Sequence, residues 1–297
     1  MRPPVRIWTK ARSNARWRFR TTTLAGGLAV DERRKTFAAN RAVGRITLTV
    51  ENDGRRSLRS GLYEDGPLRA RFPHGPSLEA VIVNTAGGVA GGDRFSLDVN
   101  VGAGAELTLT TAAAEKVYRA LDDDATIDVR LKLGAGATLA WLPQETILFD
   151  GARLSRSIDI DAAADARLVL AEALVFGRTA MGEIVSHGRL MDRWRVRRAA
   201  ELVFADTVSL DGAIAAQLAH AAVAAGACAI GTVMAMPADA ATADRVRALD
   251  FRGEVGVSAW NGFALARLVA RNGEDLRRDL ARVLPAMGGR LPRLWPT

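Results

Sequence analysis

The chain has 297 residues, of which 48% are hydrophobic and 25% charged, and its mean hydropathy is +0.03. These values predict a folded protein with a substantial core, and they exclude a mainly disordered chain. No apolar run approaches the roughly 20 residues of a membrane helix, and the formal charge of +8 does not by itself indicate an anionic partner, because residues 1–20 carry much of the basic excess.

In chain order, residues 1–38 come first and are interpreted as a basic, flexible N-terminal extension. They lack the apolar core of a secretory signal. Residues 39–297 are expected to form a single β-rich domain, with its β-body over roughly 40–235.

Alternation of apolar and polar residues, which is typical of half-buried strands, begins at Ile46 and returns several times. Asp53-Gly54 follows the first run and indicates a hairpin. Residues 101–107 (VGAGAEL) are echoed at 133–139 (LGAGATL) and more faintly at 164–168. Each copy is interpreted as strand, Gly-Ala turn, strand. The pattern predicts a mainly β fold of layered, elongated sheets, like a sandwich or a solenoid.

Helical spacing of apolar residues is confined to the C-terminal part, at 240–249 and 273–284, with Pro285 expected to end the second helix. A few C-terminal α-helices are therefore expected. The apolar stretch 214–236 is interpreted as buried core. It contains the lone Cys228, which excludes an internal disulfide and favours a reducing compartment, with the cytoplasm as the default.

The segment 84–93 (NTAGGVAGGD) is the most unusual local feature. A phosphate-binding loop would need a Lys and a Ser or Thr after the last glycine, but Asp93 follows instead. Tight turns that require glycine are the preferred interpretation.

Residues 110–119 end a strand with Glu115, Lys116, Tyr118 and Arg119 close together, which suits either a partner-recognition patch or an ordinary charged turn. Further along, Glu145, Asp150, Glu172 and Glu183 lie among apolar neighbours. A carboxylate in that company is either paired with an arginine, such as Arg178, or it lines a hydrated path for a cation. The sequence favours arginine pairing.

A catalytic or fixed metal site is poorly supported. The three histidines, at 74, 187 and 220, are far apart in the sequence, and Cys228 has no CxxC partner. Neither a GxSxG nor an HExxH motif is present. The sequence therefore predicts that the protein is not an enzyme and holds no tightly bound cofactor.

Six blocks, in order, resemble the urease accessory protein family UreD (UreH). They are residues 62–69 (LYEDGPLR), 84–93, 110–119, 141–153, 176–183 and 291–295 (LPRLW). The resemblance implies a mainly β accessory protein of the urease nickel-insertion machinery. It implies binding to UreF, indirectly to the GTPase UreG, and to the urease apoprotein, and it allows a dimer within that larger complex.

The resemblance also implies a route for Ni²⁺ in transit, for which loosely arranged oxygen ligands are suitable. Our candidates for this path are Thr85, Asp93, Glu145, Asp150, Glu172 and Glu183. The candidates for partner binding are Lys116, Tyr118, Arg119 and Trp295.

Two alternatives remain. A basic nucleic-acid-binding protein would explain the pI of about 10.6, but RNP-type aromatic motifs and a helix-turn-helix pattern are lacking. A small-molecule enzyme would need ATP or NAD to bind the glycine-rich segment 84–93.

Overall fold

The computed structural model describes residues 41–295, except the side chain of Ala180. The basic extension over 1–38, as predicted from the sequence, lies outside the described residues. Every structural statement below concerns 41–295.

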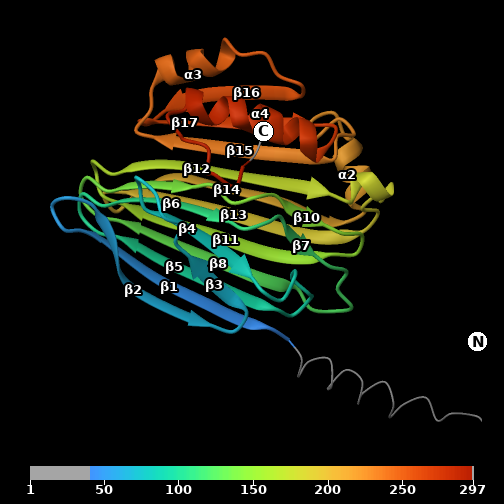
Figure 1. Cartoon of the computed structure of the whole chain (residues 1–297). Coiled ribbons are helices and arrows are strands. Elements are labelled where there is room, and N and C mark those ends of the chain that lie inside the picture. The colour runs from blue at the N-terminus through green and yellow to red at the C-terminus, as the bar shows by residue number, and fades with distance from the viewer. Residues whose placement is uncertain (1–40, 296–297) are drawn as a thin grey trace, which may run out of the picture. The chain divides into compact units, whose positions relative to one another are not determined.

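Two β-sheets face each other across the main core (Figure 1). Sheet A is seven-stranded, in the order β14-β13-β11-β8-β5-β1-β2. Its strands, in chain order, are β1 (Val43–Asn52), β2 (Ser57–Asp65), β5 (Arg94–Val101), β8 (Ala125–Leu133), β11 (Arg153–Ala162), β13 (Gly188–Arg198) and β14 (Glu201–Gly212). The β1–β2 hairpin forms around the predicted Asp53-Gly54 turn.

Sheet B has the order β16-β17-β15-β12-β9-β6-β4-β3, with β10 pairing with β12 and with β7. Its strands are β3 (Leu68–Arg71), β4 (Glu79–Asn84), β6 (Glu106–Thr111), β7 (Glu115–Val117), β9 (Thr138–Trp141), β10 (Thr146–Leu148), β12 (Arg167–Phe176), β15 (Ala229–Met236), β16 (Glu254–Trp260) and β17 (Phe263–Ala270). The helices are η1 (Thr179–Met181), α2 (Ile214–Ala219), α3 (Ala240–Arg247) and α4 (Gly273–Ala286).

The predicted repeat is the stacking unit of the fold. In each unit a strand of sheet A passes through a short turn into a strand of sheet B: β5 into β6, β8 into β9, and β11 into β12. Successive units pair in parallel in both sheets. Gly104 and Gly136 have positive φ at the turns, and turn backbones bond to one another, as from Gly104 N to Ala135 O at 2.8 Å. The predicted solenoid-like layering is confirmed.

Alternation sets which residues fill the space between the sheets. Inward positions of the repeat strands carry Leu and Ile, such as Leu131, Ile158 and Leu170, each at most 1% exposed. The outer positions of sheet A carry charged or polar residues. The hydrophobic effect therefore fixes the register of every unit.

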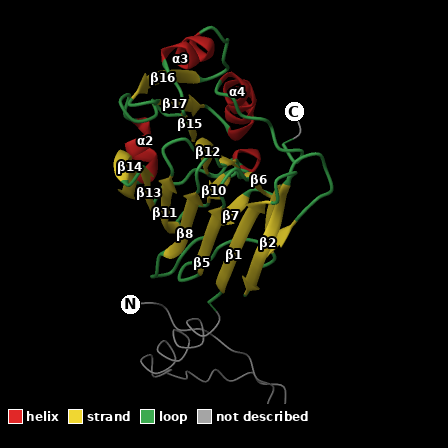
Figure 2. Ribbon diagram, turned by 90° about the vertical axis from the view of Figure 1, so that its left-hand side faces the viewer, coloured by secondary structure: helices red, strands yellow, loops and turns green. Residues whose placement is uncertain are grey.

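A second core lies on the outer face of sheet B, where α3 and α4 cover β12, β15 and β17 (Figure 2). Asn272 caps α4 and Asp239 caps α3, each by accepting a backbone N–H through its side chain. Both predicted C-terminal helices are confirmed. Pro285, however, lies inside the last turn of α4, and the helix ends at the next residue.

The C-terminal part contains more β-structure than the sequence indicates. The predicted core stretch 214–236 divides into α2, an exposed turn and β15, and the hairpin β16–β17 follows α3. The hairpin turns at Asn261 and Gly262, both with positive φ, a pairing typical of a tight two-residue turn. No helix within residues 41–295 has both the length and the apolarity to cross a membrane.

Candidate functional site

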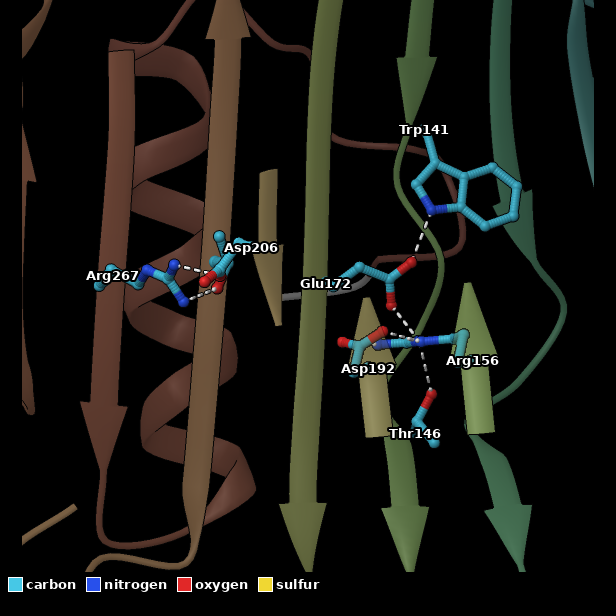
Figure 3. Close-up of polar contacts among 8 residues, drawn as sticks. Trp141, Thr146, Arg156, Glu172, Asp192, Asp206 and Arg267 are labelled. Atoms are coloured by element: carbon cyan, nitrogen blue, oxygen red, sulfur yellow. Dashed lines mark hydrogen bonds and ion pairs between the residues drawn. The ribbon is translucent and has the colours of Figure 1, made fainter. Parts of the chain in front are cut away.

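A buried charge network lies between the two sheets (Figure 3). Arg156 on β11 and Asp192 on β13 are direct neighbours across a parallel strand pair. Two hydrogen bonds join them, Nε to Oδ1 at 2.9 Å and Nη2 to Oδ2 at 2.7 Å. Arg156 Nη1 also donates to Glu172 Oε2 at 2.5 Å, and Trp141 Nε1 donates to Glu172 Oε1 at 2.6 Å. We call Trp141, Thr146, Arg156, Glu172 and Asp192 the buried network.

The three charged side chains of the buried network are each no more than 5% exposed. Burial raises the pKa of Glu172, against the opposing effect of Arg156. A cavity of about 10 Å³ beside Glu172 and Asp192 continues toward Asp206 and Arg267, which form a second, partly exposed ion pair. The arginine-pairing interpretation describes Glu172, whose two oxygens both have donors.

A second group lies where β7, β10 and β12 end, and we call it the loop-end cluster: Tyr118, Arg119, Phe149, Asp150, Arg178 and Glu183. The rings of Tyr118 and Phe149 meet edge to face at 5.3 Å, and the Arg178 guanidinium lies 4.3 Å from the Phe149 ring centroid. The Tyr118 hydroxyl donates to Gly87 O at 2.8 Å, which ties the cluster to the glycine-rich segment.

Each carboxylate of the loop-end cluster has an arginine and backbone donors. Arg119 Nη2 lies 3.0 Å from Asp150 Oδ2, and Arg178 Nε lies 2.7 Å from Glu183 Oε2. Backbone donation by His187 is the main effect that lowers the pKa of Asp150, while the hydrogen bond from Arg178 is the main effect that lowers the pKa of Glu183. Both side chains are therefore carboxylates at neutral pH.

The loop-end cluster is bordered by exposed apolar side chains. Leu121, Met181 and Ile184 are 71%, 72% and 68% exposed, and Tyr118 is 37% exposed. Since the two arginines and two carboxylates of the cluster pair with one another, this end of sheet B presents apolar and aromatic surface beside paired charges, a composition found at protein interfaces.

Glu145 lies in a third environment, beneath the C-terminal tail (residues 290–295). Arg277 of α4 binds its carboxylate with two bonds of 2.6 and 2.8 Å and stands 5.7 Å from the Trp295 ring. Trp295 is 7% exposed and donates its indole N–H to Leu142 O at 3.2 Å. The side chain of Trp295 is thus used inside the chain, to hold the tail on sheet B.

The remaining candidates occupy the glycine-rich segment and its neighbour β7. Asp93 is 5% exposed and accepts backbone N–H groups of Ala42 and Ala90 at 2.9 and 2.7 Å. Thr85 donates its hydroxyl to Pro67 O at 2.8 Å. The Lys116 side chain is exposed, and its backbone carbonyl accepts the Val89 N–H at 2.7 Å. These hydrogen bonds hold the segment 84–93 in a set of tight turns, which is the interpretation that the sequence favours.

Glu115, which the sequence placed beside Lys116, Tyr118 and Arg119 in one polar patch, lies largely buried next to the glycine-rich segment. Its carboxylate accepts the Asn84 side-chain amide at 3.1 and 3.2 Å and has no arginine partner within residues 41–295. Desolvation by burial, opposed by the Asn84 hydrogen bond, raises the pKa of Glu115 to about 7.

The candidates therefore do not gather in one place. Asp150 and Glu183 from the proposed path share the loop-end cluster with Tyr118 and Arg119 from the proposed partner surface. Glu172 lies in the buried network, and the others lie elsewhere. Within the described residues, no group of three or more His, Cys, Asp or Glu side chains forms a metal centre.

Sequence reasoning missed Arg156 and Asp192. Both stand at inward positions of a strand, between Leu154 and Ile158 in one case and between Leu190 and Trp194 in the other. A charged residue in the apolar phase of an alternating strand is the signal that would have found them.

The described domain coincides with a known family. A model of the family described as UreD urease accessory protein matches residues 42–296. A urease accessory protein UreD of Rhodopseudomonas palustris (strain CGA009) is 56% identical over 266 residues, 88% of this chain and 95% of the relative. One from Bradyrhizobium sp. (strain BTAi1), named urease accessory protein UreD 3, is 54% identical over 264 residues, 87% of this chain and 95% of the relative.

Proposed function

Because the chain belongs to the UreD urease accessory protein family, we propose that it is a non-enzymatic accessory protein in the maturation of urease, required for nickel insertion into the apoprotein. The observation that carries the proposal is the family match over 42–296, which spans nearly the whole described domain. In this role the chain works in the cytoplasm and bridges UreF, and through UreF the GTPase UreG, to urease.

The loop-end cluster and its apolar border are the proposed partner surface. Tyr118 is partly exposed and held in place by Phe149 and by Gly87 O, so little side-chain entropy is lost when a partner covers it. Arg119 and the exposed Lys116 lie beside it. Trp295 contributes indirectly, by fixing the C-terminal tail, since its ring is already buried.

We place the transient Ni²⁺ path by asking which carboxylates can exchange an arginine for a cation. Exposed ion pairs contribute only about 0.2–1 kcal/mol, whereas a buried carboxylate that loses its partner costs several times more. Arg119 and Arg178 are 69% and 44% exposed, so Asp150 and Glu183 release their partners most easily.

The other path candidates follow in order of burial. Arg277, the partner of Glu145, is 28% exposed, which makes Glu145 the next candidate. Thr85, in the glycine-rich segment 84–93, donates its hydroxyl hydrogen to Pro67 O, so its oxygen can still act as a ligand. The carboxylate of Asp93 accepts backbone N–H groups, and that of Glu172 is bound by Arg156. These two residues therefore support the path mainly by stabilising the fold.

Deletion and complementation test the proposed function. A strain that lacks this gene but retains urease and the other accessory genes should lose most urease activity and urease-bound nickel, and the intact gene should restore both. Full ureolysis with normal nickel content in the deletion strain would contradict the proposal.

Co-purification with UreF and apo-urease tests the partner surface. The variants Tyr118→Ala and Leu121→Asp should reduce retention of at least one partner, while Tyr63→Ala, which changes an exposed tyrosine of sheet A, should not. Equal retention by all three variants would remove the loop-end cluster as the partner surface.

A further inference from the structure

A groove crosses the outer face of sheet B at the end opposite the loop-end cluster. It has a volume of about 540 Å³ and lies over the first residues of β6, β9 and β12. The segment 77–78 closes one end, and α3 with the exit of α4 closes the other. None of the proposed path or partner residues lines it.

The floor of the groove follows from strand register. Thr108, Ala140, Val169 and Ala235 are successive neighbours across β6, β9, β12 and β15. These are short side chains at outward positions, and three of the four are apolar, so the floor is mostly apolar. Such a floor accommodates small apolar side chains rather than a bulky ring.

The length of the groove can be estimated from the sheet. It runs from the start of β4 to the end of β15, four strand spacings away, which is about 19 Å. An extended peptide of about six residues spans that distance. A cross-strand groove of this length suits a short extended segment.

Charge distinguishes the two ends of the groove. Arg167, Arg245 and Arg290 line the end near α3 and α4, and Glu106 lines the other. Glu106 and Arg167 are two strands apart, on either side of Thr138, and no ion pair joins them within residues 41–295. Among residues 41–295, none of the three arginines forms an ion pair.

The arginine charges are hydrogen-bonded at most to neutral groups. Arg245 donates to Ala286 O at 3.1 Å and to Thr242 Oγ1 at 3.0 Å. Asp239 lies near enough to interact with Arg245 electrostatically, yet it is engaged as the cap of α3. Other arginines near this face, such as Arg277 and Arg293, do have a carboxylate partner. The basic end of the groove therefore has capacity for external carboxylates.

We propose that this groove binds an extended acidic segment of a partner protein, about six residues long, with small apolar side chains on the floor and carboxylates at Arg167, Arg245 and Arg290. The proposal goes beyond the proposed function, since it needs neither urease nor nickel. A nucleic acid is the less suitable occupant, because the floor offers no aromatic ring for base stacking.

Site-specific photocrosslinking on the purified full chain tests the proposal. The photoreactive residue p-benzoylphenylalanine is placed at Thr138, at the rim of the groove, and at Thr47 on the outer face of sheet A as a control position. The probes are capped hexapeptides of alternating glutamate and valine, the same peptide with glutamine, and the same with lysine. Local crosslinking separates binding in the groove from binding to the basic residues 1–20.

The glutamate peptide should crosslink at Thr138 and not at Thr47, about tenfold more than the glutamine peptide, with loss at high salt. Arg167→Glu with Arg290→Glu should reduce the crosslink about tenfold. The matched double variant Arg252→Glu with Arg282→Glu, which reverses two exposed arginines outside the groove, should leave it unchanged.

Three outcomes would overturn the proposal. These are no crosslink at Thr138, equal crosslinking of the glutamate and glutamine peptides, and equal loss in the two double variants. A hexathymidylate that displaces the glutamate peptide at equal concentration would assign the groove to nucleic acid instead. All of these results are independent of urease maturation, so their failure leaves the proposed function standing.

Discussion

Arg156 and Arg178 each bind a carboxylate, one inside the molecule and the other at its surface. Arg156 is 5% exposed and shared between Glu172 and Asp192, whereas Arg178 is 44% exposed and bonded to Glu183. The chemistry of the two contacts is the same, but their surroundings differ. Bulk water can replace the exposed Arg178 at Glu183, whereas Arg156 is shielded from bulk water at Glu172 and Asp192.

The comparison shows why the same pair of residue types can serve stability in one region and exchange in another. A buried carboxylate that loses its partner keeps its desolvation cost, so the buried network holds the two sheets in one arrangement. The carboxylates of the loop-end cluster pair with exposed arginines, which leave at little cost, so we propose that this cluster can accept a cation or a partner in place of its arginines.

Removing the buried arginine should have the largest effect on stability. Arg156→Met leaves Glu172 and Asp192 buried without a cation and should lower the free energy of unfolding by about 3–5 kcal/mol, measured by urea denaturation. Arg178→Met, the matched surface change, should lower it by less than about 1 kcal/mol. Similar losses in the two variants would break the comparison.

Trp141→Phe sharpens the account of the buried network. The variant removes the donor to Glu172 Oε1 and should cost about 1.5–3 kcal/mol, because the bond is to a charged, buried acceptor. Trp194→Phe serves as control, since Trp194 is also buried, at 5% exposure, and makes no side-chain hydrogen bond within residues 41–295. If thermal unfolding shows equal losses, the hydrogen bond contributes nothing measurable.

Glu115 provides an intermediate case, a largely buried carboxylate without an arginine. Its folded pKa of about 7 lies above the ordinary value of 4.5 for a glutamate, so the folded state binds the proton more tightly than the unfolded state. Stability should therefore fall as pH rises from about 4.5 to 7 and stay level above. Glu115→Gln should stabilise the protein at pH 8 by about 1–2 kcal/mol and have little effect at pH 4. A gain of equal size at both pH values would exclude titration of Glu115 as the cause.

The smallest stability effect is expected at the loop-end cluster. Asp150→Asn keeps the size of the side chain and weakens an exposed pair with Arg119, so the free energy of unfolding should change by less than about 1 kcal/mol. A loss comparable to that of Arg156→Met would mean that the cluster is part of the structural core.

The fold was predictable because its signals are local and repeated. The alternation at 46–50 indicates a strand, and the two similar Gly-Ala turns at 101–107 and 133–139 indicate both the turn and the repeated stacking unit. The hairpin β16–β17 was missed because its strand β16 alternates Gly256 and Ser258 with Val255 and Val257, which gives little apolar contrast against the neighbouring helices.

The candidate site was only partly predictable, because it depends on contacts between distant residues. The sequence could name Glu145 and Glu172 as carboxylates in apolar company, but not their partners, which lie 132 and 16 residues away. Arg178 was correctly suggested as a partner because it is only five residues from Glu183. Trp295 was proposed for partner docking, yet its ring is buried. The sequence does not reveal the path of the C-terminal tail across sheet B, and the burial depends on it.

The nickel content of urease matured with a loop-end variant tests the central claim most directly. Asp150→Asn combined with Glu183→Gln should leave the chain folded and bound to its partners while lowering nickel per urease several-fold. The control Asp98→Asn alters a half-buried carboxylate of sheet A that is also paired with arginines, and it should give normal loading. Normal nickel content in the double variant, with the chain present at its usual level, would contradict the claim that these surface carboxylates exchange their arginines for the metal.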